Sequence, residues 1–322
     1  MMFTGAGFTK NFGGFLGVEM WSKIFNNPKV QAHQKIADLM RDDFDFESVY
    51  ARVVRGTGFT EAEVAAMKAA VNEAYKGLDG VVRKWVFNHD NPIALNTHGL
   101  NGNLLNLLHG AGENGLIFTL NQDLYFERHN GFVTPGAPRL PFGNGITDMQ
   151  ELTTDRFVQL PGATDAAAKF QTDLDCMAGI AYIKLHGSYG WRSADGGNQM
   201  IIGHDKVGDI DREPLLKRYF EFFKERINGG EAKLLIIGYS FSDQHVNLAL
   251  LEAIKERGLK LYIISPSPAK KLHDHFQSEG HLYAADIWKG VAGYFPHSLR
   301  DVFPPSQATT EHFEEIKRAL LT

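Results

Sequence analysis

The stretch that decides the fold is Lys233-Leu234-Leu235-Ile236-Ile237, followed at once by Gly238-Tyr239-Ser240-Phe241-Ser242-Asp243. A short, continuous apolar run is typical of a strand that is buried on both faces of a parallel sheet. The glycine after it lets a ligand approach the backbone closely, and the serines offer hydroxyls to a phosphate or a ribose. Ser242 also suits the N-cap of a following helix. The stretch therefore predicts a buried strand that ends in a polar loop.

More runs of the same kind lie elsewhere in the chain, and helical patterns separate the later ones. They are residues 116–119, 181–185 and 259–264, with a weaker run at 282–285, while residues 1–4 have the pattern of a strand end. Strand and helix in alternation indicate an α/β fold with a doubly wound, Rossmann-like and mostly parallel sheet. We expect residues 1–26 and 111–322 to form this domain.

The span 27–110 has a different pattern, and we expect it to be an inserted helical subdomain. Thr60-Glu61-Ala62-Glu63 matches a capping box, in which the threonine and the second glutamate each bond the other's backbone amide. Apolar residues then recur at spacings of three and four, as on one face of a long helix: Val64, Met67, Val71, Ala74, Leu78, Val81 and Trp85. Such a face packs in the core or forms a seam between subunits.

Residues 129–165 are rich in loop-forming residues, among them Pro135, Pro138, Pro141, Gly143 and Gly145. Long loops of this kind in compact domains often serve as lids or binding flaps. We therefore expect this segment to act as a lid or flap.

Composition limits the class of protein. The 322 residues are 43% apolar and 22% charged, which excludes wholesale disorder. A formal net charge of −5 and the lack of a sustained basic run argue against a strongly basic nucleic-acid binder. Cys176 is the only cysteine, so neither an internal disulfide nor a cysteine-rich zinc site can form. No membrane-length apolar run and no secretory signal is visible, so we expect a cytoplasmic protein, although the native start could lie upstream.

Polar motifs follow several predicted strands, and ligands of open α/β sheets bind beyond the carboxyl ends of the strands. Gly5-Ala6-Gly7-Phe8-Thr9 follows the first strand and forms either a phosphate-binding turn or a plain glycine turn. Asn121-Gln122-Asp123 follows the next run and either faces the crevice or makes an Asx turn or helix cap. His186 follows a third run, where a histidine suits a general base. Ser265 ends a fourth run with a similar polar cluster.

The remaining histidines show no spacing typical of a metal site, so we expect no metal. We interpret them as surface or core polar residues, among them His98, His109, His129, His204, His245, His273, His275, His281 and His297. The same interpretation stands as the alternative for His186.

Taken in chain order, these motifs resemble those of the sirtuin superfamily, an NAD-consuming α/β fold. Gly5-Ala6-Gly7 resembles its Gly-Ala-Gly phosphate turn, and Asn121-Gln122-Asp123 resembles its Asn-Ile-Asp element. Leu185-His186-Gly187 is similar to the motif that holds its base histidine, and Gly238-Tyr239-Ser240 falls where the family has a Gly-Thr-Ser ribose and phosphate loop. The last two motifs look most like those of the bacterial sirtuin-like domain of anti-phage defence systems.

The chain also departs from the sirtuin deacylases. Residues 189–213 contain no cysteine, where deacylases carry a four-cysteine zinc ribbon. Gln122 replaces the usual isoleucine beside the nicotinamide pocket, and the segment from Asp123 to His186 is longer than a deacylase would suggest. Family members without the ribbon resemble NAD hydrolases that deplete the cofactor during infection. The resemblance thus implies an NAD+ hydrolase that produces nicotinamide and ADP-ribose, with NAD as substrate.

The resemblance also implies a role for each motif residue. Asn121 would hold the nicotinamide ribose and place the attacking water, His186 would act as the base, and Asp123 would bind the carboxamide or orient its neighbours. The glycine turn and Thr9 would cradle the pyrophosphate, and two serines would contact the adenosine side. The expected cofactor-binding residues are Gly5, Ala6, Gly7, Thr9, Gln122, Gly238, Ser240 and Ser265.

Two other functions would use the same residues. One is a non-hydrolytic regulatory subunit that binds NAD or ADP-ribose, and the other is a protein deacylase, which the missing ribbon disfavours. An ordinary Rossmann-type reductase is disfavoured because the six-residue glycine fingerprint and the acidic residue on a second strand are missing. By resemblance, such chains pair with a translocase-type ATPase or a short argonaute, so we expect a homo-oligomer with a partner of this kind. We expect neither a membrane association nor sequence-specific binding of nucleic acid.

Overall fold

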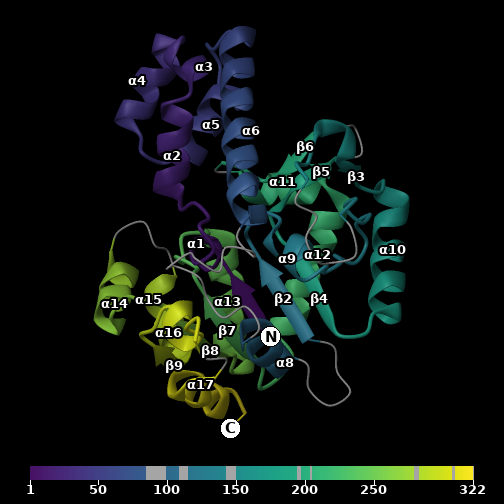
Figure 1. Cartoon of the computed structure of the whole chain (residues 1–322), viewed down its shortest axis with the longest axis vertical. Coiled ribbons are helices and arrows are strands. Elements are labelled where there is room, and N and C mark those ends of the chain that lie inside the picture. Colours follow the sequence, from purple (N-terminus) through teal and green to yellow (C-terminus); the bar gives the residue numbers. More distant parts are fainter. Residues whose placement is uncertain are drawn as a thin grey trace.

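The chain folds around a six-stranded sheet in which all neighbouring strands are parallel (Figure 1). The computed structural model describes residues 1–84, 99–108, 115–142, 150–193, 197–203, 205–278, 283–306 and 309–321. The spatial order of the strands is β4 (Ile180–Lys184), β2 (Gly115–Thr119), β1 (Met2–Thr4), β7 (Lys233–Ile237), β8 (Lys260–Ile264) and β9 (Val291–Phe295). Numbered by their place in the chain, these strands run 3-2-1-4-5-6, the order of a doubly wound dinucleotide-binding sheet. The predicted Rossmann-like α/β fold is confirmed.

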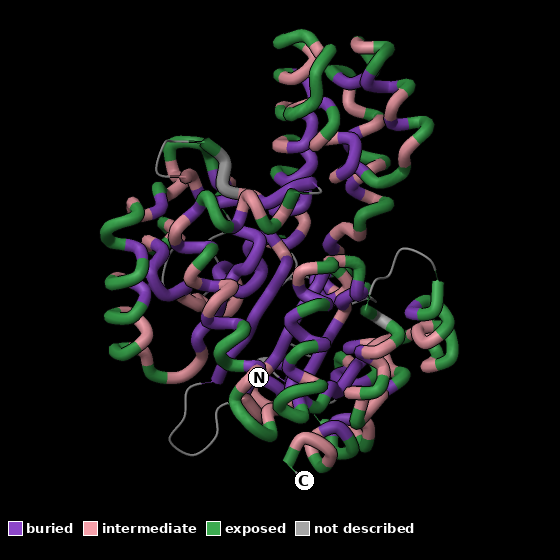
Figure 2. The backbone as a smooth tube through the Cα atoms, turned by 180° about the vertical axis from the view of Figure 1, so that it is seen from behind, coloured by how far each residue is buried: buried purple, intermediate pink, exposed green. Residues whose placement is uncertain are grey.

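Both faces of the sheet are covered by helices, so the strands are buried (Figure 2). Alternate residues of a strand enter different cores: Met2 packs in one and Phe3 in the other. The first core includes residues of α1 (Ala6–Lys10), α9 (Tyr125–His129), α16 (Leu299–Val302) and α17 (Glu311–Leu321). The second includes residues of α10 (Ala163–Cys176), α12 (Pro214–Ile227), α13 (Gln244–Arg257), α14 (Ala269–Gln277) and α15 (Ala284–Ile287).

A cluster of helices projects from the sheet domain (Figure 1). It contains α2 (Gly17–Phe25), α3 (Pro28–Gln31), α4 (Gln34–Asp42), α5 (Phe46–Arg55) and α6 (Glu61–Lys84). The predicted capping box forms at the start of α6: the Thr60 amide donates to Glu63 Oε2 at 2.7 Å, and the Glu63 amide donates to Thr60 Oγ1 at 3.3 Å. The predicted apolar face of α6 is buried at Met67, Val71, Ala74 and Leu78, whereas Trp85 lies outside the described residues. α2 precedes the predicted boundary at residue 27 but packs against α5 and α6.

A small second sheet joins β3 (Val158–Gln159), β5 (Gly187–Arg192) and β6 (Asn198–Met200). Sequence analysis did not predict it, because β5 reads Gly-Ser-Tyr-Gly-Trp-Arg and lacks a continuous apolar run. Most of β5, together with β6 and α11 (Lys206–Arg212), falls within residues 189–213, the region in which deacylases carry the zinc ribbon.

The weak strand expected at 282–285 is wrong. Ala284–Ile287 is helix α15, Leu282 lies outside the described residues, and the sixth strand is β9. β9 is an edge strand that is largely half-buried and contains Gly293, so its sequence lacks the apolar run of a central strand. The shorter helical segments are η2 (Leu100–Leu104), α8 (Leu105–Leu107), η3 (Thr154–Arg156) and η4 (Trp288–Gly290). Among the helices of the described part, none has the length and apolar character that crossing a lipid bilayer requires.

Candidate functional site

A cavity of about 1010 Å³ lies beyond the carboxyl ends of β1, β2, β4 and β7. Between β1 and β7 the order of the strands reverses, and this switch point is the usual ligand site of open α/β sheets. The helical cluster supplies the opposite wall through Met20, Glu47 and Tyr75. Ten of the eleven predicted site residues line the cavity: Gly5, Ala6, Gly7, Thr9, Asn121, Gln122, Asp123, His186, Gly238 and Ser240.

The first glycine turn is pressed against the loop after β7. The Gly5 amide donates to the Ile237 carbonyl at 3.1 Å, and the Gly7 amide donates to the Gly238 carbonyl at 3.0 Å. A Cβ on Gly7 would lie 2.7 Å from the Gly238 Cα, so only glycine fits there. The amides of Gly5 and Gly7 thus bond the chain itself, and the expected contact of this turn with a pyrophosphate stays a prediction. Their lack of side chains instead lets two site loops touch.

Thr9, Asn121 and Asp123 form a connected network beside this turn. The Thr9 hydroxyl donates to Asp123 Oδ2 at 2.7 Å and accepts from Asn121 Nδ2 at 2.8 Å. Asn121 Nδ2 also donates to the Gly5 carbonyl at 2.9 Å, and Asp123 Oδ1 accepts from the Tyr125 amide. Within the described residues no hydrogen bond engages Asn121 Oδ1, so the half-buried Asn121 presents an acceptor to the cavity. Asp123 thus bonds its neighbours Thr9 and Tyr125, and its role towards a bound cofactor stays a prediction.

Gln122 lines the cavity, but its side chain bonds mainly to the protein. Its Nε2 donates to the Ile201 carbonyl at 2.9 Å, and its Oε1 accepts from the Tyr75 hydroxyl. These bonds tie the loop after β2 to α6 and to the segment after β6. Gln122 therefore braces three parts of the wall in addition to facing the space where a cofactor would lie.

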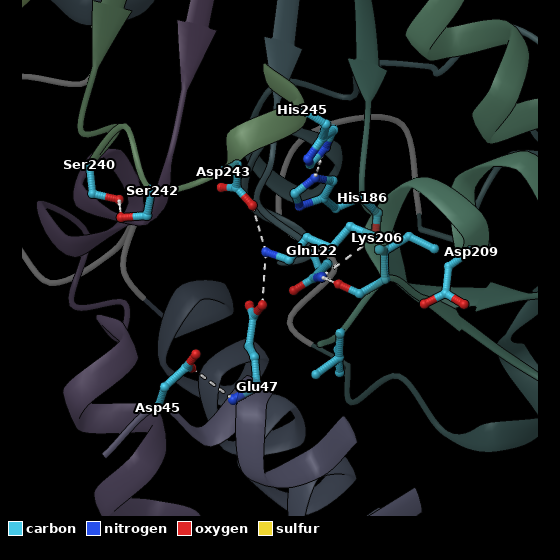
Figure 3. A network of polar contacts seen from close by, with 12 residues as sticks. Asp45, Glu47, Gln122, His186, Lys206, Asp209, Ser240, Ser242, Asp243 and His245 are labelled. Atoms are coloured by element: carbon cyan, nitrogen blue, oxygen red, sulfur yellow. Dashed lines mark hydrogen bonds and ion pairs between the residues drawn. The ribbon is translucent and has the colours of Figure 1, made fainter. Parts of the chain in front are cut away.

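His186 occupies the turn between β4 and β5 and is only 3% exposed. Its Nε2 lies 3.0 Å from His245 Nε2, and the His245 side chain also lines the cavity (Figure 3). Burial lowers the pKa of His186 well below its ordinary value, against the opposing effect of Asp243. Burial likewise lowers the pKa of His245 to about 4. Both imidazoles are neutral at pH 7, as a base must be before it accepts a proton.

Lys206 of α11 connects the helical cluster to the sheet domain across this cavity (Figure 3). Its ammonium lies 2.8 Å from Glu47 Oε2 of α5 and 2.6 Å from Asp243 Oδ1. Burial would lower the pKa of Lys206, but the two carboxylates raise it. Burial would raise the pKa of Asp243, but His186 and Lys206 lower it, so this carboxyl is ionised at neutral pH. Burial raises the pKa of Glu47 in spite of Lys206.

His186, Asp243 and His245 bring one donor atom each to within 4.8 Å of one another. Donors of this kind suit a transition metal. However, the Lys206 ammonium already bonds the Asp243 carboxylate, and the two imidazoles bond each other, so we assign no ion to this cluster.

The serines occupy two different places. Ser240 lies on the rim of the cavity, where its exposed hydroxyl bonds that of Ser242 at 2.9 Å. Ser242 is not the predicted N-cap of α13, since Asp243 holds that position. Ser265 follows β8, the next strand outward, and its hydroxyl accepts from the Ser267 amide. It is not among the described residues that line the cavity, so its contact with an adenosine stays a prediction.

The described residues of the expected lid or flap at 129–165 lie away from this cavity. They line two other cavities, around Phe132 and Arg139, and none of them lines the large cavity. Gly143 and Gly145 lie outside the described residues. In the described part of the chain the wall opposite the sheet comes instead from α2, α5 and α6.

Three further residues line the cavity: His245, which was interpreted as a surface or core polar residue, and Lys206 and Glu47, which no motif indicated. His245 follows the quoted strand-end stretch by two residues, and the first turn of a helix that follows a strand faces the crevice, so a local signal existed. Lys206 and Glu47 come from α11 and α5, far from any strand-end motif. No sequence spacing relates these two residues, because only the docking of the helical cluster brings them together.

Residues 162–284 match the family model described as the SIR2-like domain. This span contains β4, β7 and β8 with His186, Ser240 and His245, whereas Asn121 and the glycine turn precede it. No curated protein matches the chain significantly. SIR2-like domains use NAD as a substrate, so the match indicates an NAD-utilising enzyme. Residues 162–284 are thus similar to the SIR2-like domain, and the fold and the cavity agree with a relationship to the sirtuin-like superfamily.

Proposed function

We propose that this protein is an NAD+ hydrolase that cleaves the nicotinamide–ribose bond to give nicotinamide and ADP-ribose. The observation that carries the proposal is that Asn121, Asp123 and His186, from two separate strand ends, line one cavity together with the Gly5–Gly7 turn. That cavity lies at the switch point of the sheet, where dinucleotides bind in doubly wound folds.

The chemistry requires little help for the leaving group. The nicotinamide ring of NAD is a pyridinium cation, so it departs as a neutral molecule with the electron pair of the C–N bond. The site must hold the ribose, stabilise its oxocarbenium-like transition state and place a water molecule. Four carboxylates line the described cavity, from Asp45, Glu47, Asp123 and Asp243, against the single ammonium of Lys206. Those carboxylates that are ionised favour the positive charge that develops on the ribose.

Asn121 is placed to orient the water. Its NH2 group is fixed by the Gly5 carbonyl and the Thr9 hydroxyl, which leaves Oδ1 to accept a hydrogen bond. A water that donates to this oxygen is held with its lone pair free for attack. Asp123 contributes by fixing the Thr9 hydroxyl, and the neutral His186 accepts a proton from a ribose hydroxyl or from the water.

The decisive experiment measures nicotinamide and ADP-ribose by mass spectrometry after incubation of NAD with the purified chain. We expect Asn121→Ala and His186→Ala each to lower the rate by about 10²-fold or more. Asn228→Ala and His275→Ala are matched controls outside the cavity lining, and we expect near-normal rates from them. Full activity of both site variants would refute these roles. Binding of NAD by the wild type without any product would favour the regulatory-subunit alternative.

The resemblance also supports a role in anti-phage defence, in which NAD depletion stops an infected cell, and a partner such as a translocase-type ATPase or a short argonaute. Deacylation is disfavoured because the ribbon region contains β5, β6 and α11 and no cysteine. An acyl-lysine peptide assay tests deacylation directly. A phage challenge of cells that carry the wild type or His186→Ala tests the role in defence. Protection by both proteins would show that defence does not require NAD cleavage.

A further inference from the structure

The pair formed by His186 and His245 is held by three different elements. His186 lies in the turn after β4, and His245 lies in the first turn of α13, whose N-cap is Asp243. Their rings face each other at a centroid distance of 5.1 Å with an interplanar angle of 29°. Phe220 of α12 packs against His245, with ring centroids 5.3 Å apart, and so restricts its movement. These contacts hold the two imidazoles in a fixed relative orientation.

The charge state of the pair allows one shared proton. Since both imidazoles are neutral, one of them donates through Nε2–H and the other accepts at the 3.0 Å contact. Asp243, Lys206 and Glu47 are the charged groups that act on this pair or bond to those that do. Asp243 attracts a proton on either imidazole, whereas burial and Lys206 oppose it. The pair therefore stays neutral until a proton is delivered to it, and Asp243 is the group that stabilises the cation then formed.

The two rings differ in their access to water. His186 is almost fully buried, whereas His245 is half-buried on the cavity wall. The His186 ring is almost closed off from bulk water, and the adjacent His245, which is more exposed, offers a second route for its proton. Within the described residues no hydrogen bond engages His186 Nδ1, which leaves that nitrogen for substrate.

We propose that His245 is a proton-relay and positioning residue, which accepts the proton that His186 removes during NAD cleavage. This inference rests on the proposed function. The attacking water gives a proton to His186 Nδ1, either directly or through a ribose hydroxyl that passes on its own proton and takes up that of the water, while the Nε2–H of His186 passes to His245 Nε2. The water oxygen forms the new bond to the ribose, and nicotinamide leaves with the electrons of the broken C–N bond. His186 ends neutral in its other tautomer, and His245 ends as an imidazolium near Asp243.

The test compares His245→Ala with His245→Gln. Glutamine keeps a hydrogen-bonding group near the position of Nε2 but cannot carry the proton as an imidazolium does. We expect both variants to lower kcat by 10- to 100-fold with KM for NAD changed less than threefold, and to flatten the pH profile of kcat. The matched control is His275→Ala, an exposed histidine of α14. Thermal unfolding confirms that each variant is folded, and if the alanine variant is not, the glutamine variant decides alone.

Several outcomes would overturn the relay. Recovery of kcat to within threefold of the wild type in His245→Gln would show that His245 only orients His186. A His245→Ala variant with the kcat of the wild type would show that His245 has no role in the reaction. A wild type that releases no nicotinamide would refute the proposed function as well, so the two failures are distinguishable. Independently of turnover, imidazole ¹⁵N NMR of the free protein should show His186 protonated at Nε2, and protonation at Nδ1 would contradict the stated direction of transfer.

Discussion

Gly238 shows how a single position joins two motifs that lie far apart in the chain. Its φ is +70°, and a Cβ there would lie 2.1 Å from the Phe8 amide nitrogen and 2.6 Å from the Gly7 Cα. Gly238 is thus required because the first glycine turn packs against it, and not only because a ligand could approach it. The two loops that are expected to hold one dinucleotide are in direct contact because neither carries a side chain at this point.

At this scale we expect Gly238→Ala to destabilise the protein by about 3 kcal/mol or more, since a backbone clash adds to the left-handed conformation. The cavity should be lost with it, and NAD cleavage should fall by at least 10²-fold. Gly258→Ala is the matched control: Gly258 also has a φ of +70°, but no atom lies within 4 Å of its would-be Cβ. It should lose only about 1–2 kcal/mol. Urea unfolding of both variants measures the difference, and equal losses would contradict the proposed clash.

At the scale of elements, α9 locks α6 to the sheet domain through consecutive polar residues. Arg128 donates from Nε to Asp79 Oδ1 at 2.6 Å and from a terminal nitrogen to Oδ2 at 2.7 Å, and both side chains are buried. His129 Nε2 bonds the Val82 carbonyl at 2.8 Å. Burial lowers the pKa of His129 to about 4, although the bond to Val82 opposes this shift. α6 thus reaches the cavity with a fixed orientation, which positions Tyr75 above Gln122.

The lowered pKa of His129 predicts a pH dependence of stability. Its folded pKa lies below the unfolded value of 6.5, so the unfolded chain binds the proton more readily as the pH falls from about 6.5 to 4. The titration of His129 therefore lowers the free energy of unfolding by about 2 kcal/mol when the pH falls from 7 to 5. His129→Gln keeps a donor for the Val82 carbonyl but does not titrate. Between pH 7 and pH 5 the variant should therefore lose about 2 kcal/mol less unfolding free energy than the wild type. Urea unfolding at the two pH values gives this difference directly, and parallel losses would contradict a buried neutral His129.

At the scale of the whole molecule, the cavity lies between the sheet domain and the helical cluster, and charge connects its two sides. Lys206 carries the connection from Glu47 of α5 to Asp243 at the start of α13, with side chains 14–26% exposed. Removing one partner from a largely buried ion group leaves the others uncompensated and is more costly than losing an exposed pair. Lys206 thus supplies one of the polar links between the two walls of the cavity, beside the Tyr75–Gln122 and Arg128–Asp79 bonds.

We expect Lys206→Met to lower stability by about 3 kcal/mol and to raise KM for NAD more than it lowers kcat, because the wall loosens while His186 stays in place. Arg212→Met on the same helix is the control: Arg212 also pairs with carboxylates, but its side chain is 69% exposed. It should change stability by about 0.5 kcal/mol or less. If the two variants behaved alike in unfolding and in kinetics, the link across the cavity would be refuted.

The strands, the sheet class and ten cavity residues were predictable because each depends on a few neighbouring residues. Apolar runs such as Lys233-Leu234-Leu235-Ile236-Ile237 identify buried strands, and the carboxyl ends of parallel strands must share one edge. Local pattern failed where a strand lacks an apolar run, as at β5 and β9. It also suggested a lid or flap at 129–165, whose described residues do not line the cavity.

The sequence by itself determined which strand ends carry glycine, amide and imidazole, and hence that a polar site forms at the edge of a parallel sheet. Only the tertiary structure decided that His245 faces His186, that Lys206 bonds Glu47 and Asp243, and that α6 forms the far wall. The physical reason is that secondary structure follows short-range periodicity. The contacts of these side chains depend instead on how separately folded helices dock, which no spacing along the chain records.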